Sequence, residues 1–317
     1  NGSIDIHNAI VARGGSERAR KNQRLIIGPW PHGGANRSKF GEIDFGPNAA
    51  VDLAQEQIRW FDHWLKGADN GVEADPPVRI FTMGTNVWRE EKHWPPPGTG
   101  RREFFLASAG RANTPGGDGV LISGAPSRPG VDRYRYDPRD PVPSLWTAAL
   151  QTIPAEQGQL KHRRDILVYQ TEPLGEPMEV TGYPEVELFA ASSAPDTDFF
   201  VRLIDVSPDG RGIDVASGMV RARYRTSLKA PAPIVPGETI RYVIRLGPTS
   251  VQFRTGHRIR LDVTSSDFPN YDRNHNTAAD QNVDTRLVPA EQTVFHGGGR
   301  ASRLVVPVTT SAATRRK

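Results

Sequence analysis

Short apolar runs and one helical stripe follow one another over the first hundred residues, which predicts a small unit of mixed α and β structure. Residues 22–27 contain the apolar run Leu25-Ile26-Ile27, which ends at a Gly-Pro turn, and residues 78–83 form a second, mostly apolar run. Both are expected to be strands, the second of them buried. Residues 1–20 have the spacing of a helix that begins abruptly, and residues 28–48, rich in Gly, Pro and Asn, are predicted to be a long loop.

The helical stripe between the two strands is the clearest periodic signal in the chain. It consists of Val51, Ala54, Ile58, Phe61 and Leu65, extended by Trp60 and Trp64. Asn48 is predicted to cap a helix that begins near Ala49, and Gly67 stands where a C-terminal cap belongs. An apolar stripe of this width predicts that the helix lies flat against a sheet. Strand, loop, helix and strand together predict a parallel αβ unit.

The pattern changes after Trp94, where the run Pro95-Pro96-Pro97-Gly98 makes a rigid break. Helical spacing is almost absent beyond this point, and short alternating or apolar runs separated by turn residues take over. The predicted strands are 103–106, 166–169, 185–190, 199–206, 215–225, 239–246, 257–263 and 304–308. This pattern predicts a β-sandwich or jelly roll, with residues 110–165 draped over it as extended loops.

Composition limits the classes of function. The chain has 317 residues and a net charge of +4 from 40 basic and 36 acidic residues, which is too balanced for a dedicated nucleic-acid binder. No apolar run approaches the roughly 20 residues that span a bilayer, so no membrane partner is predicted. The absence of cysteine excludes disulfides and zinc–thiolate sites and favours a cytoplasmic protein.

His32 is the candidate catalytic residue, because it follows a predicted strand and a Gly-Pro turn in the sequence G-P-W-P-H at 28–32. An α/β-hydrolase presents its general base in this way, and its triad follows the chain order Ser, then Asp or Glu, then His. Only 31 residues precede His32, and they contain no G-x-S-x-G elbow. From local residues alone, a catalytic histidine and a loop histidine bonded to backbone are equally good interpretations.

Other candidate sites have better structural explanations. The remaining histidines are interpreted as surface or structural residues: His63 on the polar side of the helix, His257 at a turn before a strand, and His275 and His296 in polar loops. No H-x-x-x-H or H-E-x-x-H pair occurs, so neither a metal nor a cofactor is predicted. Ser265 and Ser266 are expected to close a strand without a nucleophile elbow. The polar residues of 268–277 (Asn270, Asp272, Arg273, Asn274 and Asn276) form either part of a domain interface near the pocket or a network of Asx turns that only shapes a loop, and the second interpretation is favoured. Asp196, Thr197 and Asp198 are interpreted as a turn that opens a strand.

Six separated segments resemble the CocE/NonD hydrolases, the group typified by bacterial cocaine esterase, and are similar to X-Pro dipeptidyl-peptidases and α-amino-acid ester hydrolases. The segments are G-P-W-P-H at 28–32, F-D-H-W-L-K-G at 61–67, V-R-I-F-T-M-G with W-R over 78–89, Y-D-P-R-D-P-V-P-S at 136–144, T-D-F-F-V-R-L-I-D-V-S-P-D-G at 197–210, and the run from Gly256 to Thr277. They occur in the family's order and span nearly the whole chain.

The resemblance implies a fold and a role for each part of the chain. Residues 1–97 would be the C-terminal part of an α/β-hydrolase domain, with His32 as the triad base, and residues 98–317 an all-β jelly-roll domain. The triad serine, its aspartate and the oxyanion donors would lie in a missing N-terminal hydrolase part or another chain. The substrate would be a small-molecule ester, an amide or a peptide, and this chain alone would be inactive. The alternative hypothesis is a stand-alone jelly-roll module that binds carbohydrate or protein.

Overall fold

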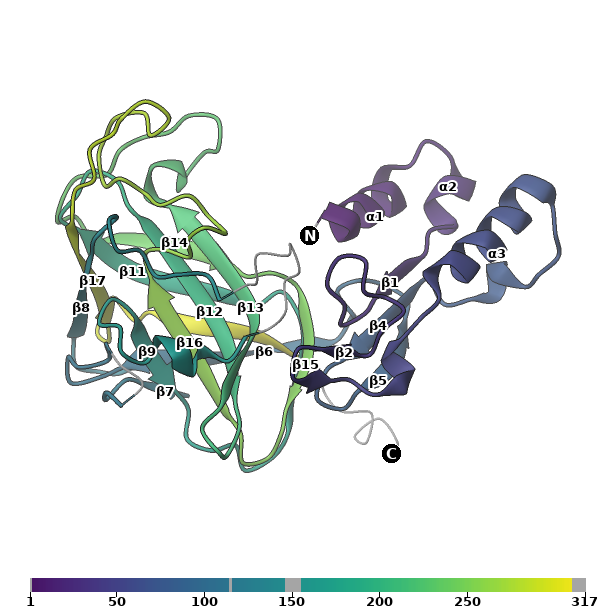
Figure 1. Ribbon diagram of the computed structural model, residues 1–317, viewed down its shortest axis with the longest axis horizontal. Coiled ribbons are helices and arrows are strands. Elements are labelled where there is room, and N and C mark those ends of the chain that lie inside the picture. Colours follow the sequence, from purple (N-terminus) through teal and green to yellow (C-terminus); the bar gives the residue numbers. More distant parts are fainter. Residues whose placement is uncertain (1, 114–115, 146–154, 310–317) are drawn as a thin grey trace.

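The computed structural model describes residues 2–113, 116–145 and 155–309, and these form two adjoining parts. Figure 1 shows a small layer of helices and strands beside a larger sandwich of strands. The small layer, called here the αβ layer, contains every helix longer than one or two turns in the described ranges. Its elements are α1 (Gly2–Arg13), α2 (Glu17–Lys21), β1 (Leu25–Ile27), β2 (Lys39–Phe40), β3 (Ile43–Asp44), η1 (Pro47–Ala49), α3 (Leu53–Lys66), η2 (Val72–Ala74), β4 (Val78–Thr82) and β5 (Val87–Glu91).

The αβ layer is built on a three-stranded sheet in the order β1-β4-β5. β1 and β4 are parallel, with Leu25 opposite Val78, as the predicted strand–helix–strand unit requires. β5 returns antiparallel to β4. Val78 and Ile80 of β4 are fully buried, which confirms the predicted buried strand. The strand predicted from residue 22 begins only at Leu25, because α2 extends to Lys21 and Asn22 caps it.

The start of α3 was predicted wrongly. Asp52, not Asn48, caps the helix, because the Asp52 side chain accepts hydrogen bonds from Ala54 N and Gln55 N. Asn48 lies in η1 instead, and the predicted loop 28–48 also contains the small β2–β3 hairpin. Gly67 ends α3 in the left-handed conformation with φ 73°, as predicted.

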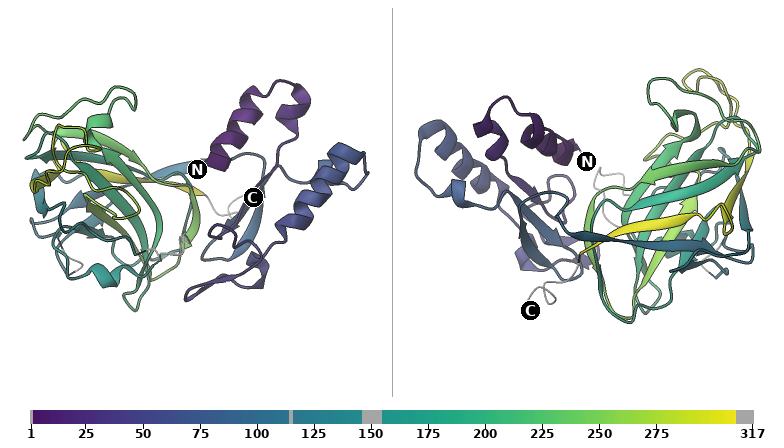
Figure 2. Two further views of the ribbon diagram at one scale, coloured as in Figure 1. Left: turned by 45° about the horizontal axis from the view of Figure 1, so that its top comes forward. Right: turned by 180° about the vertical axis from the view of Figure 1, so that it is seen from behind.

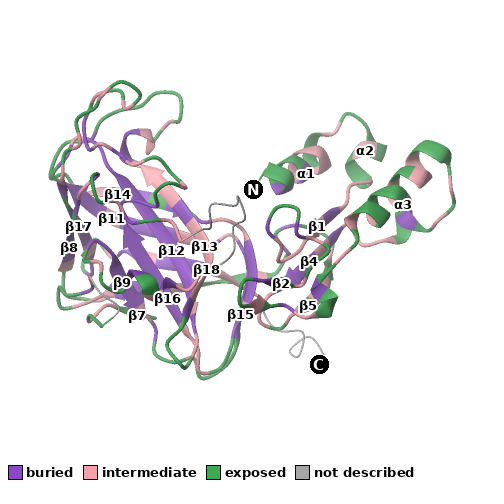
Figure 3. Cartoon of the chain, in the orientation of Figure 1, coloured by how far each residue is buried: buried purple, intermediate pink, exposed green. Residues whose placement is uncertain are grey.

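The apolar stripe of α3 does not lie against a sheet, which contradicts the prediction. No residue of α3 is buried, and Ile58, Phe61 and Leu65 are 52%, 53% and 77% exposed. Figure 3 shows α3 coloured as exposed and intermediate along its length, whereas the strands of the sandwich are mostly buried. Periodicity predicted correctly which face is apolar, but within α3 only Trp60 and Trp64 of that face are partly covered, by Arg24 and Arg18, and the rest of the stripe there stays exposed.

The sandwich contains thirteen strands joined by hydrogen bonds into one continuous sheet that folds over its own core. Its elements are β6 (Thr99–Ala107), β7 (Val120–Ile122), β8 (Gly130–Tyr136), η3 (Gln157–Leu160), β9 (Leu167–Gln170), β10 (Met178–Gly182), β11 (Glu185–Ser192), β12 (Asp198–Val206), β13 (Gly212–Arg221), η4 (Ala222–Tyr224), β14 (Ile240–Arg245), β15 (Thr249–Phe253), β16 (Arg258–Thr264), β17 (Ala290–His296) and β18 (Arg303–Thr309). The main path runs β13-β12-β16-β9-β7-β6-β18-β11-β17-β8, with β10, β14 and β15 attached beside it.

All eight strands predicted beyond residue 98 are present, and the all-β prediction for this part is confirmed. Alternate residues of β12 (Phe199, Val201 and Leu203) are buried in the core of the sandwich. Five strands were missed, namely β7, β8, β10, β15 and β17. Two of these, β7 and β8, lie in the segment predicted to be only loops. Val142 and Leu160 of that segment form a separate buried cluster with Ile166 and Val168, at the start of β9.

The turn between β4 and β5 attaches the αβ layer to the sandwich. Met83 N donates to Ser250 O at 3.0 Å, and Gln252 N donates to Met83 O at 2.8 Å, so the layer is bonded to β15 through its backbone. Thr82 Oγ1 and Ser250 Oγ lie 3.0 Å apart and are buried. Arg89 pairs with Glu179 across the same boundary. Figure 2 shows the two parts side by side from two further directions.

Gly84 allows this close approach, and its substitution tests the boundary. A Cβ at Gly84 would meet Gln252 O at 2.4 Å, and its φ is +88°. We expect Gly84→Ala to destabilise the chain by about 1–3 kcal/mol more than Gly71→Ala, measured by urea unfolding. Gly71 is the matched control, because its φ is +74° but nothing lies within 4 Å of a Cβ there. Equal effects of the two substitutions would contradict the close contact.

No helix among the described residues is both long and apolar enough to cross a bilayer.

Candidate active site

His32 lies on a tight turn directly after the parallel strand β1. Gly34 N donates to Pro31 O at 3.0 Å and closes the turn around His32 and Gly33. Gly33 has a φ of +72°, which the third residue of a type II turn requires and which glycine adopts without strain. The turn therefore presents the His32 side chain at the carboxyl end of β1.

Aromatic residues on both sides of the turn anchor it to the αβ layer. Trp30 Nε1 donates to Ala49 O at 2.6 Å, and the Trp30 and Trp88 rings lie 5.7 Å apart between centroids. Phe40, from the β2–β3 hairpin, is 2% exposed and belongs to the same buried cluster as Phe81 of β4. These contacts fix the backbone around His32, and a catalytic base needs such a fixed position.

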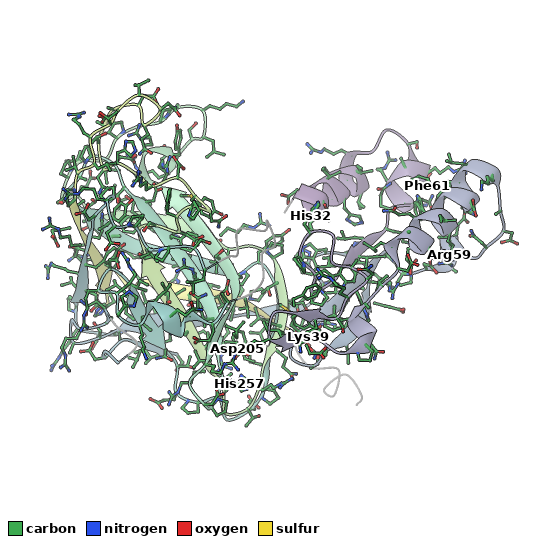
Figure 4. All side chains as sticks on the ribbon, in the orientation of Figure 1. His32, Lys39, Arg59, Phe61, Asp205 and His257 are labelled. Atoms are coloured by element: carbon green, nitrogen blue, oxygen red, sulfur yellow. The ribbon has the colours of Figure 1, made fainter. Side chains whose placement is uncertain are left out.

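The His32 ring itself is free. His32 is exposed, and within the described ranges its ring has no hydrogen bond or ion pair. Figure 4 places His32 on the side of the αβ layer nearer the sandwich. Among the described residues, no serine or carboxylate makes a hydrogen bond or ion pair with this ring. The catalytic role of His32 therefore stays a prediction.

His257 and His63 have structural partners. His257 Nδ1 lies 2.9 Å from Asp205 Oδ1, and both residues are labelled in Figure 4 at the edge of the sandwich near the αβ layer. Burial raises the pKa of Asp205, and the bond to His257 opposes that rise. His63 Nδ1 lies 2.9 Å from Ala68 O and its Nε2 lies 3.0 Å from Glu73 Oε1, so this residue stabilises the end of α3.

A serine, a histidine and an aspartate do meet inside the sandwich, at a place the sequence did not suggest. His296 ends β17 and is 3% exposed, so its predicted position in a polar loop is wrong. Its Nε2 lies 3.1 Å from Ser108 Oγ and 3.2 Å from Asp132 Oδ2. Sequence reasoning could not find this cluster, because its members come from three segments far apart in the chain: the residue after β6, strand β8 and strand β17.

The geometry of this cluster is structural. In a catalytic triad the acid contacts Nδ1 and the serine contacts Nε2, so that the serine gives its proton to the ring. Here Ser108 and Asp132 both contact the same nitrogen, and Ser108 Oγ donates directly to Asp132 Oδ2 at 2.6 Å. Tyr169 OH donates to the same oxygen at 2.8 Å. The cluster therefore satisfies a buried carboxylate and joins strands of the sandwich.

Lowering the pH should destabilise the sandwich, because Asp132 becomes protonated. Burial alone would raise the pKa of this carboxyl, but hydrogen bonds from His296, Ser108, Ala112 N and Tyr169 hold it below the ordinary value of 3.8. Its stabilisation is therefore present above pH 3.8 and is lost as the pH falls through the lower, folded-state pKa.

We expect Asp132→Asn to remove part of this acid dependence. At neutral pH the free energy of unfolding of the variant should be about 1–3 kcal/mol lower, because a charged acceptor is replaced by an amide whose N–H donors have no acceptor. Urea unfolding between pH 7 and pH 3 measures both effects. The exposed Asp69→Asn is the control, and an identical pH profile in the two variants would contradict the assignment.

The remaining polar candidates are also structural. Ser265 Oγ bonds to Tyr134 OH at 2.9 Å, and Ser266 Oγ accepts from Val142 N at 2.8 Å. Asn274 Nδ2 donates to Asp196 Oδ2 at 2.9 Å and Asp198 Oδ1 at 2.7 Å, and all three side chains are buried. The polar segment 268–277 therefore takes part in a buried network with Asp196 and Asp198, which reaches further than the predicted Asx turns within one loop. No group of side chains suited to holding a metal ion occurs in the described ranges.

The chain is similar in sequence to known proteins. The sequence profile of the X-Pro dipeptidyl-peptidase C-terminal non-catalytic domain matches residues 70–305. Cocaine esterase of Rhodococcus sp. strain MB1 Bresler is 39% identical over 295 residues, which cover 90% of this chain and 51% of that protein. The chain thus spans about half the length of this relative.

Solved structures share the fold. An α-amino acid ester hydrolase superposes with a TM-score of 0.81 at 29% identity, covering 97% of this chain and 53% of that one. A CocE/NonD family hydrolase from Staphylococcus aureus superposes with a TM-score of 0.59 at 15% identity, covering 81% of this chain and 45% of the other, which shows likeness of fold alone. The chain therefore belongs to the CocE/NonD hydrolase family and carries that family's X-Pro dipeptidyl-peptidase C-terminal domain.

Proposed function

We propose that this chain is the C-terminal part of a serine hydrolase that cleaves esters or amides through an acyl-enzyme, with His32 as general base and acid. The observation that carries the proposal is the rigid turn that holds an exposed, unpartnered histidine at the carboxyl end of a parallel strand. In this role His32 takes the proton from a serine and returns it to the leaving group.

The serine and aspartate must then come from a further hydrolase part or another chain. Two features of the αβ layer support this. β1 is an outer strand of its sheet, paired with β4 on one side only, so a further parallel strand can add beside it. The exposed apolar stripe of α3 and a cleft of about 570 Å³ between α3 and the sheet leave apolar surface for another layer to cover.

From the names of the relatives we propose that the substrate is a small-molecule ester, an amide or a peptide. The division of the chain between residues 97 and 98 stays a prediction, and so does a cytoplasmic location.

The alternative, a stand-alone binding module, would need exposed aromatics on one face of the sandwich. Trp88 lies in the αβ layer, Trp94 is 4% exposed, and Trp146 lies outside the described residues, so these tryptophans form no such row.

A chimeric enzyme tests the proposed function. The part of the Rhodococcus esterase that this chain does not match is joined ahead of Asn1, and hydrolysis of p-nitrophenyl acetate is followed. We expect negligible hydrolysis by the chain alone, because a histidine without its serine has no nucleophile to activate. The chimera should hydrolyse the ester with an acyl-enzyme burst. Robust hydrolysis by the isolated chain would overturn the proposal.

A further inference from the structure

The turn that carries His32 is tied at both ends to η1 and the residues that follow it. Trp30, two residues before His32, donates its indole N–H to Ala49 O at 2.6 Å. On the other side of the turn, Ala35 O accepts a hydrogen bond from Val51 N at 2.7 Å. Because both flanks of the turn are bonded to the same short segment, the position of the histidine depends on how firmly that segment is held.

Trp88 of β5 holds η1 from the side of the sheet. Its indole N–H donates to Asn48 O at 2.7 Å, the carbonyl next to the one that Trp30 binds. The Trp88 ring also packs edge-on against Phe81 of β4, with 5.3 Å between the ring centroids. The two tryptophans therefore bond consecutive carbonyls of η1 and contact each other, which gives His32 a fixed support two residues away.

Met83 connects this support to the sandwich. Its side chain packs against two buried clusters, of which the first is the core of the sandwich. The second, called here the aromatic cluster, consists of Phe40, Phe45, Ala49 and Phe81, with Trp30 and Trp88 packed against it. The backbone of Met83 is also bonded to β15, which Figure 1 shows at the side of the sandwich next to the αβ layer. Met83 thus belongs to both cores, so the position of the aromatic cluster depends on that of β15.

We propose that the sandwich positions His32 for catalysis, with Met83 and Trp88 as positioning residues that act through the loop and not on the reacting atoms. This inference rests on the proposed function of His32. Both residues lie within residues 70–305, which match a domain described as non-catalytic. A misplacement of about 1 Å can cost about 10²-fold in rate, so loosening this support should lower kcat and leave KM nearly unchanged.

Two methionine variants of the chimeric enzyme test the link to the sandwich. Met83→Ala and Met178→Ala each remove a methionine that packs in the sandwich core, but only Met83 also contacts the aromatic cluster. We expect Met83→Ala to lower kcat for p-nitrophenyl acetate by about tenfold or more, with KM within about twofold, and Met178→Ala to change neither. Met83→Leu should restore kcat, because leucine fills nearly the same volume. Thermal unfolding verifies that each variant is folded at the assay temperature.

Two tryptophan variants test the support itself. Trp88→Phe keeps an aromatic ring but loses the N–H that binds Asn48 O. Trp94→Phe is the matched control, because Trp94 Nε1 makes no hydrogen bond and the ring packs in a different buried cluster, with Val78 and Ile80. We expect kcat to fall by about tenfold in Trp88→Phe and to stay unchanged in Trp94→Phe.

Amide hydrogen exchange on the 317-residue chain tests the inference without the added hydrolase part. Met83→Ala should accelerate exchange at Gly34 and Val51, whose N–H groups close the loop, by about tenfold or more relative to Met178→Ala. Equal exchange in the two variants, or an unchanged kcat of Met83→Ala in a chimera that His32→Ala inactivates, would contradict this inference alone. Full activity of His32→Ala in the chimera would contradict the proposed function instead.

Discussion

Replacing His32 by alanine should lower kcat of the chimeric esterase by about 10⁴-fold or more, because the serine then loses the base that takes its proton. KM should change little, since the ring contributes to the transition state and not to ground-state binding. The fold should be unaffected, because His32 is exposed and its ring has no hydrogen bond or ion pair among the described residues. Burst kinetics with p-nitrophenyl acetate measure the first effect, and thermal unfolding checks the second.

His162→Ala is the matched control. This histidine is also exposed and lies in the sandwich between η3 and β9. We expect the control to retain full activity. If both variants hydrolysed the ester at the rate of the parent chimera, His32 would be an ordinary loop residue and the proposed role would be wrong.

Arg223→Ala should destabilise the sandwich by about 3–5 kcal/mol, because it leaves a buried carboxylate without its counter-ion. Asp196 is fully buried, and Arg223 Nε donates to its Oδ2 at 2.7 Å. The same guanidinium donates to Thr277 O at 2.6 Å and Ala279 O at 3.0 Å, so the substitution also orphans two backbone carbonyls. Urea unfolding at pH 7 measures the loss.

Arg139→Ala provides the comparison at an exposed position. Arg139 donates two hydrogen bonds to Asp137, at 2.9 and 2.8 Å, but its side chain is 60% exposed. We expect no resolvable change there, because water solvates both charges when the pair is broken. A similar loss in both variants would show that burial is not what makes the Arg223 pair important.

The sequence predicted the candidate site only where the residues involved are close together in the chain. The strand, the Gly-Pro turn and His32 are adjacent in the chain, so their pattern predicted the turn that the structure contains. The other polar clusters are not local. Ser108, Asp132 and His296 meet although Ser108 and His296 are 188 residues apart, and no spacing in the sequence reports such a meeting.

The sequence by itself determined the type of most elements, because helix and strand periods of 3.6 and 2 follow from backbone geometry and are visible within a dozen residues. It therefore predicted β4, the end of α3 at Gly67 and eight strands of the sandwich. Only the tertiary structure decided what covers each face and which strands meet. The exposed stripe of α3 and the bond between Thr82 and Ser250, 168 residues apart, depend on packing between distant segments, which periodicity does not encode.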